Sequence, residues 1–297
     1  MIVVTGATGR TGRATAEALL AKGAKVRVIG RDAKRLGPLA EMGAETFVCN
    51  VEDRTSMTEA FTGASALYLV LPEDLSQEDL RAHQERVSDS FAVAIDAANV
   101  PYVVNLSSLG AQHSKGTGPI VGLHNLEQKL NQLAELHVLH LRAAYFMENL
   151  FMSMKPLRSI GALPGALQSN APMPWIATKD IGHHAASRLA ARDFSGSTVQ
   201  ELHGQRDISM REAASIVGPA IGKPDLAYVQ FPSSTFGASL LQAGLPTKTS
   251  ALIVEMCDGA NAGLMVPQQQ RSAKNTTPTK LESFVENVFA PAYLHNV

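Results

Sequence analysis

The sequence predicts an α/β fold: a doubly wound, mostly parallel sheet with helices on both faces, followed by a smaller, mostly helical C-terminal part. Two observations lead to this prediction. Short apolar runs alternate with helical patterns through the first half of the chain, which is typical of successive β-α-β units. The β-branched run Ile2 to Val4 leads directly into the glycine-rich stretch TGATGRTG at 5–12, and a helix-forming stretch follows.

The sheet is expected to contain the apolar runs at 2–4, 25–30, 45–48, 65–71, 102–106 and 137–142. Helical patterns separate these runs at 11–22, 32–42, 55–62, 77–99 and 122–135. Strands that alternate with helices pair in parallel, and their crossovers are right-handed. Both faces of the sheet are therefore expected to be covered by helices.

The pattern changes after about residue 155, where closely spaced prolines and glycines break the chain into turns. Further patterns predict a helix at 179–191, a strand at 198–202 and helices at 209–220, 233–243, 247–262 and 279–288. Residues 267–278 are polar and bounded by prolines, which predicts a surface loop. The expected division is a first domain at 1–155, to which 175–203 returns, and a smaller cap at 156–297.

Composition limits the partners and the compartment. The 297 residues, 45% hydrophobic, are enough for one large or two modest domains. A net charge of −1 creates no field that would attract nucleic acid or an anionic membrane, so neither is expected as a direct partner. No apolar run reaches the roughly 18 residues of a membrane span and no cleavable leader is recognised, so a cytoplasmic location is expected. Cys49 and Cys257 lack a metal-binding spacing, and neither a metal nor a disulfide is expected.

Three glycines spaced three residues apart occupy the first strand-to-helix turn. Gly6, Gly9 and Gly12 lack Cβ atoms, so the backbone can turn sharply, approach a ligand and pack its helix closely on the sheet. The free N–H groups and positive dipole end of the helix suit a pyrophosphate. The stretch predicts a dinucleotide site in a Rossmann-type fold; the alternative is a glycine-rich turn without a ligand.

The end of the second expected strand indicates which dinucleotide is bound. An acidic residue about 20 positions beyond the glycines would bind the ribose hydroxyl of NAD, but Gly30 and Arg31 stand there. Arg31, with Lys34 and Arg35 one helical turn further on, offers cations to a 2′-phosphate, which favours NADP(H). In the alternative, these cations form a solvated helix face behind an N-capping Asp32, which could itself bind a ribose.

Three stretches are similar to segments of a known family. They are TGATGRTG together with GRDAKR, NLSSLG after the fifth expected strand, and HLRAAYFMENL after the sixth. Over nearly its whole length the chain resembles the NmrA-like group of atypical short-chain dehydrogenases, whose Arg-x-x-x-Phe-x-Glu-Asn segment the last stretch resembles most specifically. The resemblance implies either an NADPH-dependent reductase of quinones, azo dyes and related compounds or a protein that binds the nucleotide only to sense redox state.

The resemblance also implies which residues bind NADP(H). The pyrophosphate would lie at Gly6, Thr8, Gly9, Arg10, Thr11 and Gly12. The adenosine phosphate would lie at Arg31, the adenosine ribose at Leu71 and Pro72, and the nicotinamide ribose at Ser107 and Ser108.

One catalytic feature of typical short-chain dehydrogenases is missing. They use Tyr-x-x-x-Lys, a phenol whose proton loss is helped by a lysine four residues later. No lysine stands four residues after any of the five tyrosines, and Lys129 does not have that spacing. The helix expected to carry the pair offers His124, which could donate a proton or bind the nicotinamide ribose. In the alternative, His124 is a polar residue at the start of a helix.

The substrate is expected beyond the sixth strand, because ligands of open parallel sheets bind at the carboxyl ends of the strands. Tyr145, Phe146, Met147 and Asn149 follow that strand, and Trp175 would line the same cleft. Aromatic and thioether side chains favour a flat apolar acceptor, and Asn149 could bind a carbonyl or azo nitrogen. In the alternative, Phe146, Met147 and Trp175 are core residues.

Two functions remain. The preferred one is an NADPH-dependent oxidoreductase that transfers a hydride to a planar conjugated acceptor such as a quinone or azo compound. Such a transfer needs mainly alignment of donor and acceptor, and protonation can follow. The alternative is a non-catalytic NADP(H)-binding redox sensor that acts through a protein partner. A homodimer is compatible with either function.

Overall fold

In the computed structural model, which describes residues 1–295, the centre of the molecule is a parallel sheet of seven strands. In spatial order the strands are β3 (Glu45–Val48), β2 (Val26–Gly30), β1 (Ile2–Val4), β4 (Ala66–Val70), β5 (Tyr102–Ser108), β6 (His137–Ala143) and β10 (Ser197–Leu202). The predicted fold class is therefore confirmed. The strand expected at 102–106 continues to residue 108, which brings the NLSSLG stretch to the edge of the sheet.

The chain leaves the middle of this sheet in two directions. From β1 it proceeds through β2 to β3 at one edge, whereas from β4 it proceeds through β5 and β6 toward the other edge. The winding therefore reverses between the neighbouring strands β1 and β4. The carboxyl ends of strands at such a reversal form the usual ligand crevice of an open parallel sheet.

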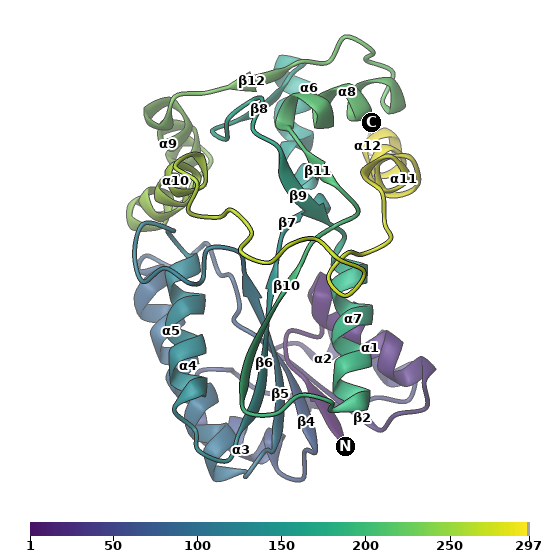
Figure 1. Cartoon of the computed structure of the whole chain (residues 1–297), viewed down its shortest axis with the longest axis vertical. Helices are drawn as coiled ribbons and strands as arrows, with labels where there is room; N and C mark the ends of the chain where they lie inside the picture. The colour runs from purple at the N-terminus through teal and green to yellow at the C-terminus, as the bar shows by residue number, and fades with distance from the viewer. Residues whose placement is uncertain (296–297) are drawn as a thin grey trace.

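Helices cover both faces of the sheet (Figure 1). One face carries α1 (Arg10–Ala21), α2 (Ala33–Glu41) and α7 (Thr178–Ala191), and the other carries α3 (Arg54–Phe61), α4 (Leu80–Ala97) and α5 (Ile120–Asn131). Among residues 1–295, no helix combines the length and the apolar character that crossing a bilayer requires.

Alternate side chains of the strands supply two cores. Val3 and Ile29 pack with α3, α4 and α5, whereas Val4, Val28 and Tyr68 pack with α1, α2 and α7. Both faces of each inner strand are thus apolar. This arrangement explains why the strands appear in the sequence as continuous apolar runs instead of an alternating pattern.

Helix α7 lies directly against α1, the helix that follows the glycine-rich stretch. A Cβ atom at Gly182 would lie 2.5 Å from the Cβ of Ala14 and 2.7 Å from the backbone nitrogen of Thr15. Glycine at this position therefore allows the two helices to touch backbone to backbone. A segment far along the chain thus supports the helix that begins at the expected coenzyme site.

A third core lies beyond the carboxyl edge of the sheet. It includes Met147, Trp175, Phe284 and Phe289. The surrounding elements are β7 (Tyr145–Phe146), the 3-10 helix η1 (Met147–Ser153), α6 (Met154–Ile160), β8 (Leu163–Gly165), β9 (Met173–Ile176), β11 (Asp207–Ile208), α8 (Met210–Ala220), β12 (Tyr228–Gln230), α11 (Leu281–Phe284), the π-helical turn η2 (Val285–Phe289) and α12 (Ala290–His295). The helix predicted at 279–288 thus becomes a longer helical segment at 281–295.

Helices α9 (Ser233–Gln242) and α10 (Thr247–Asn261) form a hairpin above α4 and α5, across from α11 and α12 (Figure 1). Helix α10 packs closely against the loop that follows β5. A Cβ atom at Gly118 would meet the carbonyl oxygen of Leu252, and a Cβ atom at Gly259 would lie 2.2 Å from the carbonyl oxygen of Gly116. Glycines in both partners let this loop support α10.

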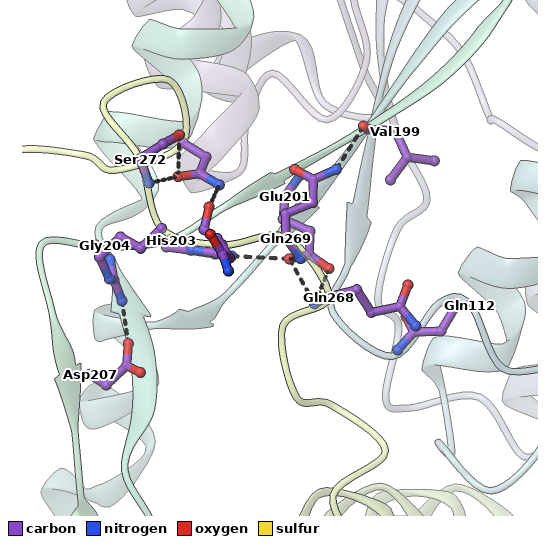
Figure 2. A network of polar contacts seen from close by, with 12 residues as sticks. Gln112, Val199, Glu201, His203, Gly204, Asp207, Gln268, Gln269 and Ser272 are labelled. Atoms are coloured by element: carbon purple, nitrogen blue, oxygen red, sulfur yellow. Dashed lines mark hydrogen bonds and ion pairs between the residues drawn. The ribbon is translucent and has the colours of Figure 1, made fainter.

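The segment 262–280 crosses from α10 to α11 over the end of β10 and is fastened there (Figure 2). The buried carboxylate of Glu201 accepts hydrogen bonds from the backbone nitrogens of Gln268, at 2.9 Å, and Gln269, at 2.9 Å. His203 Nε2 lies 3.1 Å from the same carboxylate. The loop predicted at 267–278 is exposed at 268–274, whereas Asn275 and Thr277 are buried beside His203. The buried carboxylate of Glu201 holds the start of the loop in place.

Candidate functional site

The glycine-rich stretch forms a tight loop between β1 and α1. Gly6 has a left-handed backbone with φ of 60°, and the backbone nitrogen of Gly9 donates to the Gly6 carbonyl at 2.8 Å. A Cβ atom at Gly12 would lie 2.3 Å from the same carbonyl oxygen. The N-cap residue of α1 is Gly9, which has no side chain that could cap the helix. The exposed glycine backbone therefore leaves the start of α1 open to a ligand.

Thr5 fastens this loop to the sheet, although it was not among the predicted site residues. Its side chain is fully buried, donates to the carbonyl of Tyr68 at 3.1 Å and accepts from the backbone nitrogen of Val70 at 2.8 Å. The hydroxyl thus bridges the end of β1 to β4 at the point where the winding reverses. Its position as the first residue of TGATGRTG is the only sequence signal for this role.

Three cations lie exposed beside the loop. Arg31, Lys34 and Arg35 form no ion pair within residues 1–295. Asp32 caps α2 by accepting from the backbone nitrogen of Lys34 at 2.8 Å. The two sequence interpretations are therefore compatible: Asp32 is the N-cap, and the neighbouring cations remain free for a phosphate.

A cavity of about 270 Å³ lies between α1 and α2, lined by Ala7, Thr8, Arg13, Arg35, Pro38 and Leu39. Arg35 reaches across to donate to the carbonyl of Thr8 at 3.2 Å, and Arg13 pairs with Glu17 at 2.8 Å. Arg13 was not predicted, because nothing in its local sequence separates it from an ordinary surface residue of α1. The Arg35 guanidinium adds positive charge to this side of the glycine loop, whereas Glu17 offsets the charge of Arg13.

The residues assigned to the two ribose rings lie at the ends of β4 and β5. Leu71 is buried and Pro72 is half-buried after β4. Ser107 is buried, and its hydroxyl donates to Glu127 Oε1 at 2.6 Å. Ser108 is half-buried and donates to the carbonyl of Leu109 at 2.9 Å. The Ser107 hydroxyl thus faces α5, and Ser108 is the more accessible of the two.

A buried ion pair underlies this edge of the sheet. Arg142 donates from Nε to Glu127 Oε1 at 3.0 Å and from Nη2 to Oε2 at 2.6 Å, in a two-bond geometry. Both residues are at most 9% exposed. Arg142 is the arginine of the HLRAAYFMENL stretch, so this motif residue connects β6 to α5. Glu127 was not predicted as its partner.

A second polar cluster lies beside this pair. Burial lowers the pKa of His140 to about 4, so its ring is neutral. Asn105 Nδ2 lies 3.1 Å from His140 Nδ1, and Asn131 Oδ1 lies 2.9 Å from Nε2. Nδ1 therefore accepts a hydrogen bond and Nε2 carries the proton. The cluster connects β5, β6 and α5, and it is structural.

His124 lies on the first turns of α5, half-buried, with Nδ1 2.8 Å from the carbonyl oxygen of Ala111. A carbonyl only accepts, so Nδ1 carries a proton and Nε2 of the neutral ring has a free lone pair. The neutral ring can therefore accept a hydrogen bond at Nε2, and only the imidazolium can donate one from Nε2.

Lys129, on the same helix, does not point to this site. It binds Glu85 at 2.7 Å and Asp89 at 2.5 Å, both on α4.

The predicted substrate residues divide into two groups. Trp175 is fully buried and donates from Nε1 to the carbonyl of Ile208 at 2.9 Å, and Met147 is 1% exposed. Both are core residues in this structure, which agrees with the alternative interpretation of the sequence for these two residues. Tyr145, Phe146 and Asn149 are half-buried at the carboxyl edge of the sheet.

Tyr145 packs edge-to-face on Trp175, with ring centroids 4.7 Å apart. Burial raises the pKa of its phenol to about 12. The phenol therefore stays protonated near neutral pH and can donate a hydrogen bond. The packing against a fully buried tryptophan fixes the orientation of the ring.

Glu148 of the same stretch was not predicted as a site residue. Its buried carboxylate accepts from the Thr178 hydroxyl at 2.6 Å and from the Thr178 backbone nitrogen at 3.1 Å. This carboxylate caps α7, the helix that packs on α1. The motif itself was visible in the sequence, but the partner of its glutamate was not.

These features together fit a phosphorylated dinucleotide. The exposed glycine backbone and the open end of α1 suit the diphosphate, and the unpaired cations of α2 lie on the side where a 2′-phosphate is expected. The residues at the ends of β4 and β5 lie at the same carboxyl edge of the sheet as this loop.

Several known proteins are similar over most of this chain. It is 25% identical over 290 residues to quinone oxidoreductase 2 of Escherichia coli K12, which covers 95% of this chain and 97% of that protein. It is 27% identical over 224 residues to a (4-alkanoyl-5-oxo-2,5-dihydrofuran-3-yl)methyl phosphate reductase of Streptomyces griseus, 75% of each chain. It is 22% identical over 258 residues to the NAD(P)H azoreductase of Xenophilus azovorans, 86% of each chain.

The fold is similar to that of a solved relative. The crystal structure of the NADPH-dependent quinone oxidoreductase QOR2 of Escherichia coli, complexed with NADPH, matches with a TM-score of 0.83 and 23% identity, over 97% of this chain and 100% of that chain. The named relatives are thus oxidoreductases. The model of the NmrA-like family matches residues 1–284. Because this match spans nearly the whole sequence, the chain belongs to the NmrA-like family.

Proposed function

We propose that this protein is an NADPH-dependent reductase that transfers a hydride to a planar conjugated acceptor such as a quinone or azo compound. The observation that carries the proposal is the open glycine loop at the winding reversal, with the unpaired cations Arg31 and Lys34 beside it. Its relatives act on acceptors of this kind: one is named a quinone oxidoreductase and another an azoreductase.

In this proposal the chain's residues mainly bind and align. The glycine loop and the start of α1 hold the diphosphate, and Arg31, Lys34 and Arg35 bind the 2′-phosphate. When bound, NADPH supplies the hydride. Ser108, at the end of β5, lies on the side proposed for the nicotinamide ribose, with Leu71 and Pro72 on the adenosine side.

The acceptor is proposed to lie over the end of β6. Tyr145 presents a protonated phenol held by Trp175, and Asn149 offers an amide for a carbonyl or azo nitrogen. His124 Nε2 accepts a ribose hydroxyl when the ring is neutral and donates a proton when it is charged. The chain lacks a Tyr-x-x-x-Lys pair, which such an alignment mechanism does not require.

A panel assay tests the proposal. Purified protein is mixed with NADPH and a series of quinones and azo dyes, and the loss of reduced nicotinamide absorbance is followed. We expect acceptor-dependent oxidation of NADPH, faster than with NADH. Calorimetric binding of NADPH without turnover of any acceptor would instead support the redox sensor. No binding of either coenzyme would contradict both functions.

A further inference from the structure

Arg10 is the first residue of α1, and its side chain extends from the glycine loop toward the third core. Its guanidinium carbon lies 5.2 Å from the centroid of the Phe151 ring, in η1. The side chain is exposed and forms no hydrogen bond or ion pair with another described residue in 1–295. Its N–H donors are therefore available to a ligand.

Phe151 also contacts aromatic residues of the C-terminal helical segment. Its ring packs edge-on against Phe284, with ring centroids 6.1 Å apart and ring planes at 74°. It lies tilted against Phe289, with centroids 5.7 Å apart. Phe289 in turn stacks on Tyr293 at 6.2 Å. The ring on which Arg10 rests is thus fixed by residues more than a hundred positions further along the chain.

A planar guanidinium that rests on an aromatic ring uses its face for the contact and keeps its N–H donors along the edge. Such a contact limits the rotamers of a long side chain without consuming a donor. The contact therefore reduces the loss of side-chain conformational entropy that accompanies the binding of an anion. Glu148, the acid in the same 3-10 helix, does not compete for Arg10, because its carboxylate caps α7 at Thr178.

We propose that Phe151 is a positioning residue for the coenzyme: it holds the Arg10 guanidinium at the open end of α1, ready for the diphosphate of NADP(H). This inference rests on the proposed function, since it presupposes that the coenzyme binds at the glycine loop. It adds that the aromatic cluster Phe151, Phe284, Phe289 and Tyr293 contributes to coenzyme affinity without contacting the coenzyme.

A double-mutant cycle tests the inference. Dissociation constants for NADPH are measured by calorimetry for the wild type, Phe151→Leu, Arg10→Gln and the double variant. A cation–π contact of this kind predicts about fivefold weaker binding in Phe151→Leu. In the Arg10→Gln background, the same change should have almost no effect on affinity. Phe151→Tyr, which keeps an aromatic face, should bind as the wild type does.

A second ligand separates the diphosphate from the rest of the coenzyme. Adenosine 2′-monophosphate carries the 2′-phosphate but has no phosphate at the 5′ position, where the diphosphate begins. We expect Phe151→Leu to leave its affinity unchanged. Equal weakening of both ligands, or an equal loss in the Arg10→Gln background, would show that Phe151 acts only through general packing and would overturn the inference.

The test remains decisive if Phe151→Leu does not fold. Arg10→Lys keeps the charge but loses the flat face, and is compared with Arg10→Gln in the otherwise native chain. The inference predicts that lysine recovers little of the affinity for NADPH, and full recovery would contradict it. Failure of the wild type to bind NADPH would instead refute the proposed function.

Discussion

At the scale of single residues, charge and tautomer decide what the site can bind. Arg31 and Lys34 lie exposed beside the glycine loop without a carboxylate partner in the described part of the chain. Asp32 accepts the capping bond from the Lys34 backbone nitrogen and, among residues 1–295, forms no ion pair with either cation. Free cations at the end of β2 are the feature that separates a 2′-phosphate from a bare ribose.

Arg31→Asp should discriminate between the two coenzymes. The change removes a charge-assisted bond to the 2′-phosphate and adds a repelling carboxylate, so NADPH should bind about 100-fold more weakly. Binding of NADH, which has no 2′-phosphate, should change much less. Calorimetry with both coenzymes measures this. Lys25→Asp makes the same charge change at the opposite end of β2 and is the control. An equal loss for both coenzymes would contradict the phosphate assignment.

The ring orientation of His124 gives a test of its role. Asparagine can replace the Nδ1–H bond to Ala111, whereas glutamine places a polar atom near the position of Nε2. If Nε2 contacts coenzyme or acceptor, His124→Gln should keep more kcat/KM than His124→Asn, which should lose about tenfold or more. Steady-state rates with one quinone measure the difference. The reverse order would assign His124 to the Ala111 contact alone.

At the scale of elements, the HLRAAYFMENL stretch acts mainly through its charged residues. Arg142 binds Glu127 and so connects β6 to α5, while Glu148 caps α7, which supports α1. Removing one partner of such a buried pair leaves an unpaired charge, a loss of about 3–5 kcal/mol. The most specific motif of the chain thus holds together the elements around the site.

His140 makes the junction of β5, β6 and α5 sensitive to pH. Its pKa is lowered by burial from 6.5 to about 4, so between these values the unfolded chain binds a proton that the folded chain does not. The free energy of unfolding should therefore fall as pH falls through this window, by about 3 kcal/mol at pH 4, and be unaffected by this residue above it.

The comparison is made by urea denaturation of the wild type and His140→Gln between pH 7 and pH 4. Other groups titrate in both proteins, so the relevant quantity is the difference between them. The stability advantage of the wild type over the variant should shrink as the pH falls. The same change at His295, an exposed histidine at the end of α12, is the control. A difference that stays constant with pH would contradict the assignment.

At the scale of the whole molecule, the site lies where separate units meet. The sheet and its helices provide the glycine loop, the third core provides η1 and Tyr145, and α10 rests on the loop after β5. The segment 262–280 connects α10 to α11 over the edge of the sheet and is held by Glu201 (Figure 2). In the proposed function, access of the acceptor depends on how these units are positioned relative to one another.

Local patterns in the sequence determined the parallel sheet, its flanking helices, the glycine loop and the exposed cations of α2. Strand and helix periodicity, the missing Cβ atoms of Gly6, Gly9 and Gly12, and the order of charges after β2 are all properties of neighbouring residues. Such properties need no knowledge of distant contacts.

Only the tertiary structure decided which of these residues are exposed and which contact one another. Trp175 and Met147 became core, Ser107 turned to Glu127, and Arg10 came to rest on Phe151. These outcomes depend on the packing of elements that are far apart in the sequence. Burial and pairing of a polar or aromatic side chain are set by such packing, which no local pattern encodes.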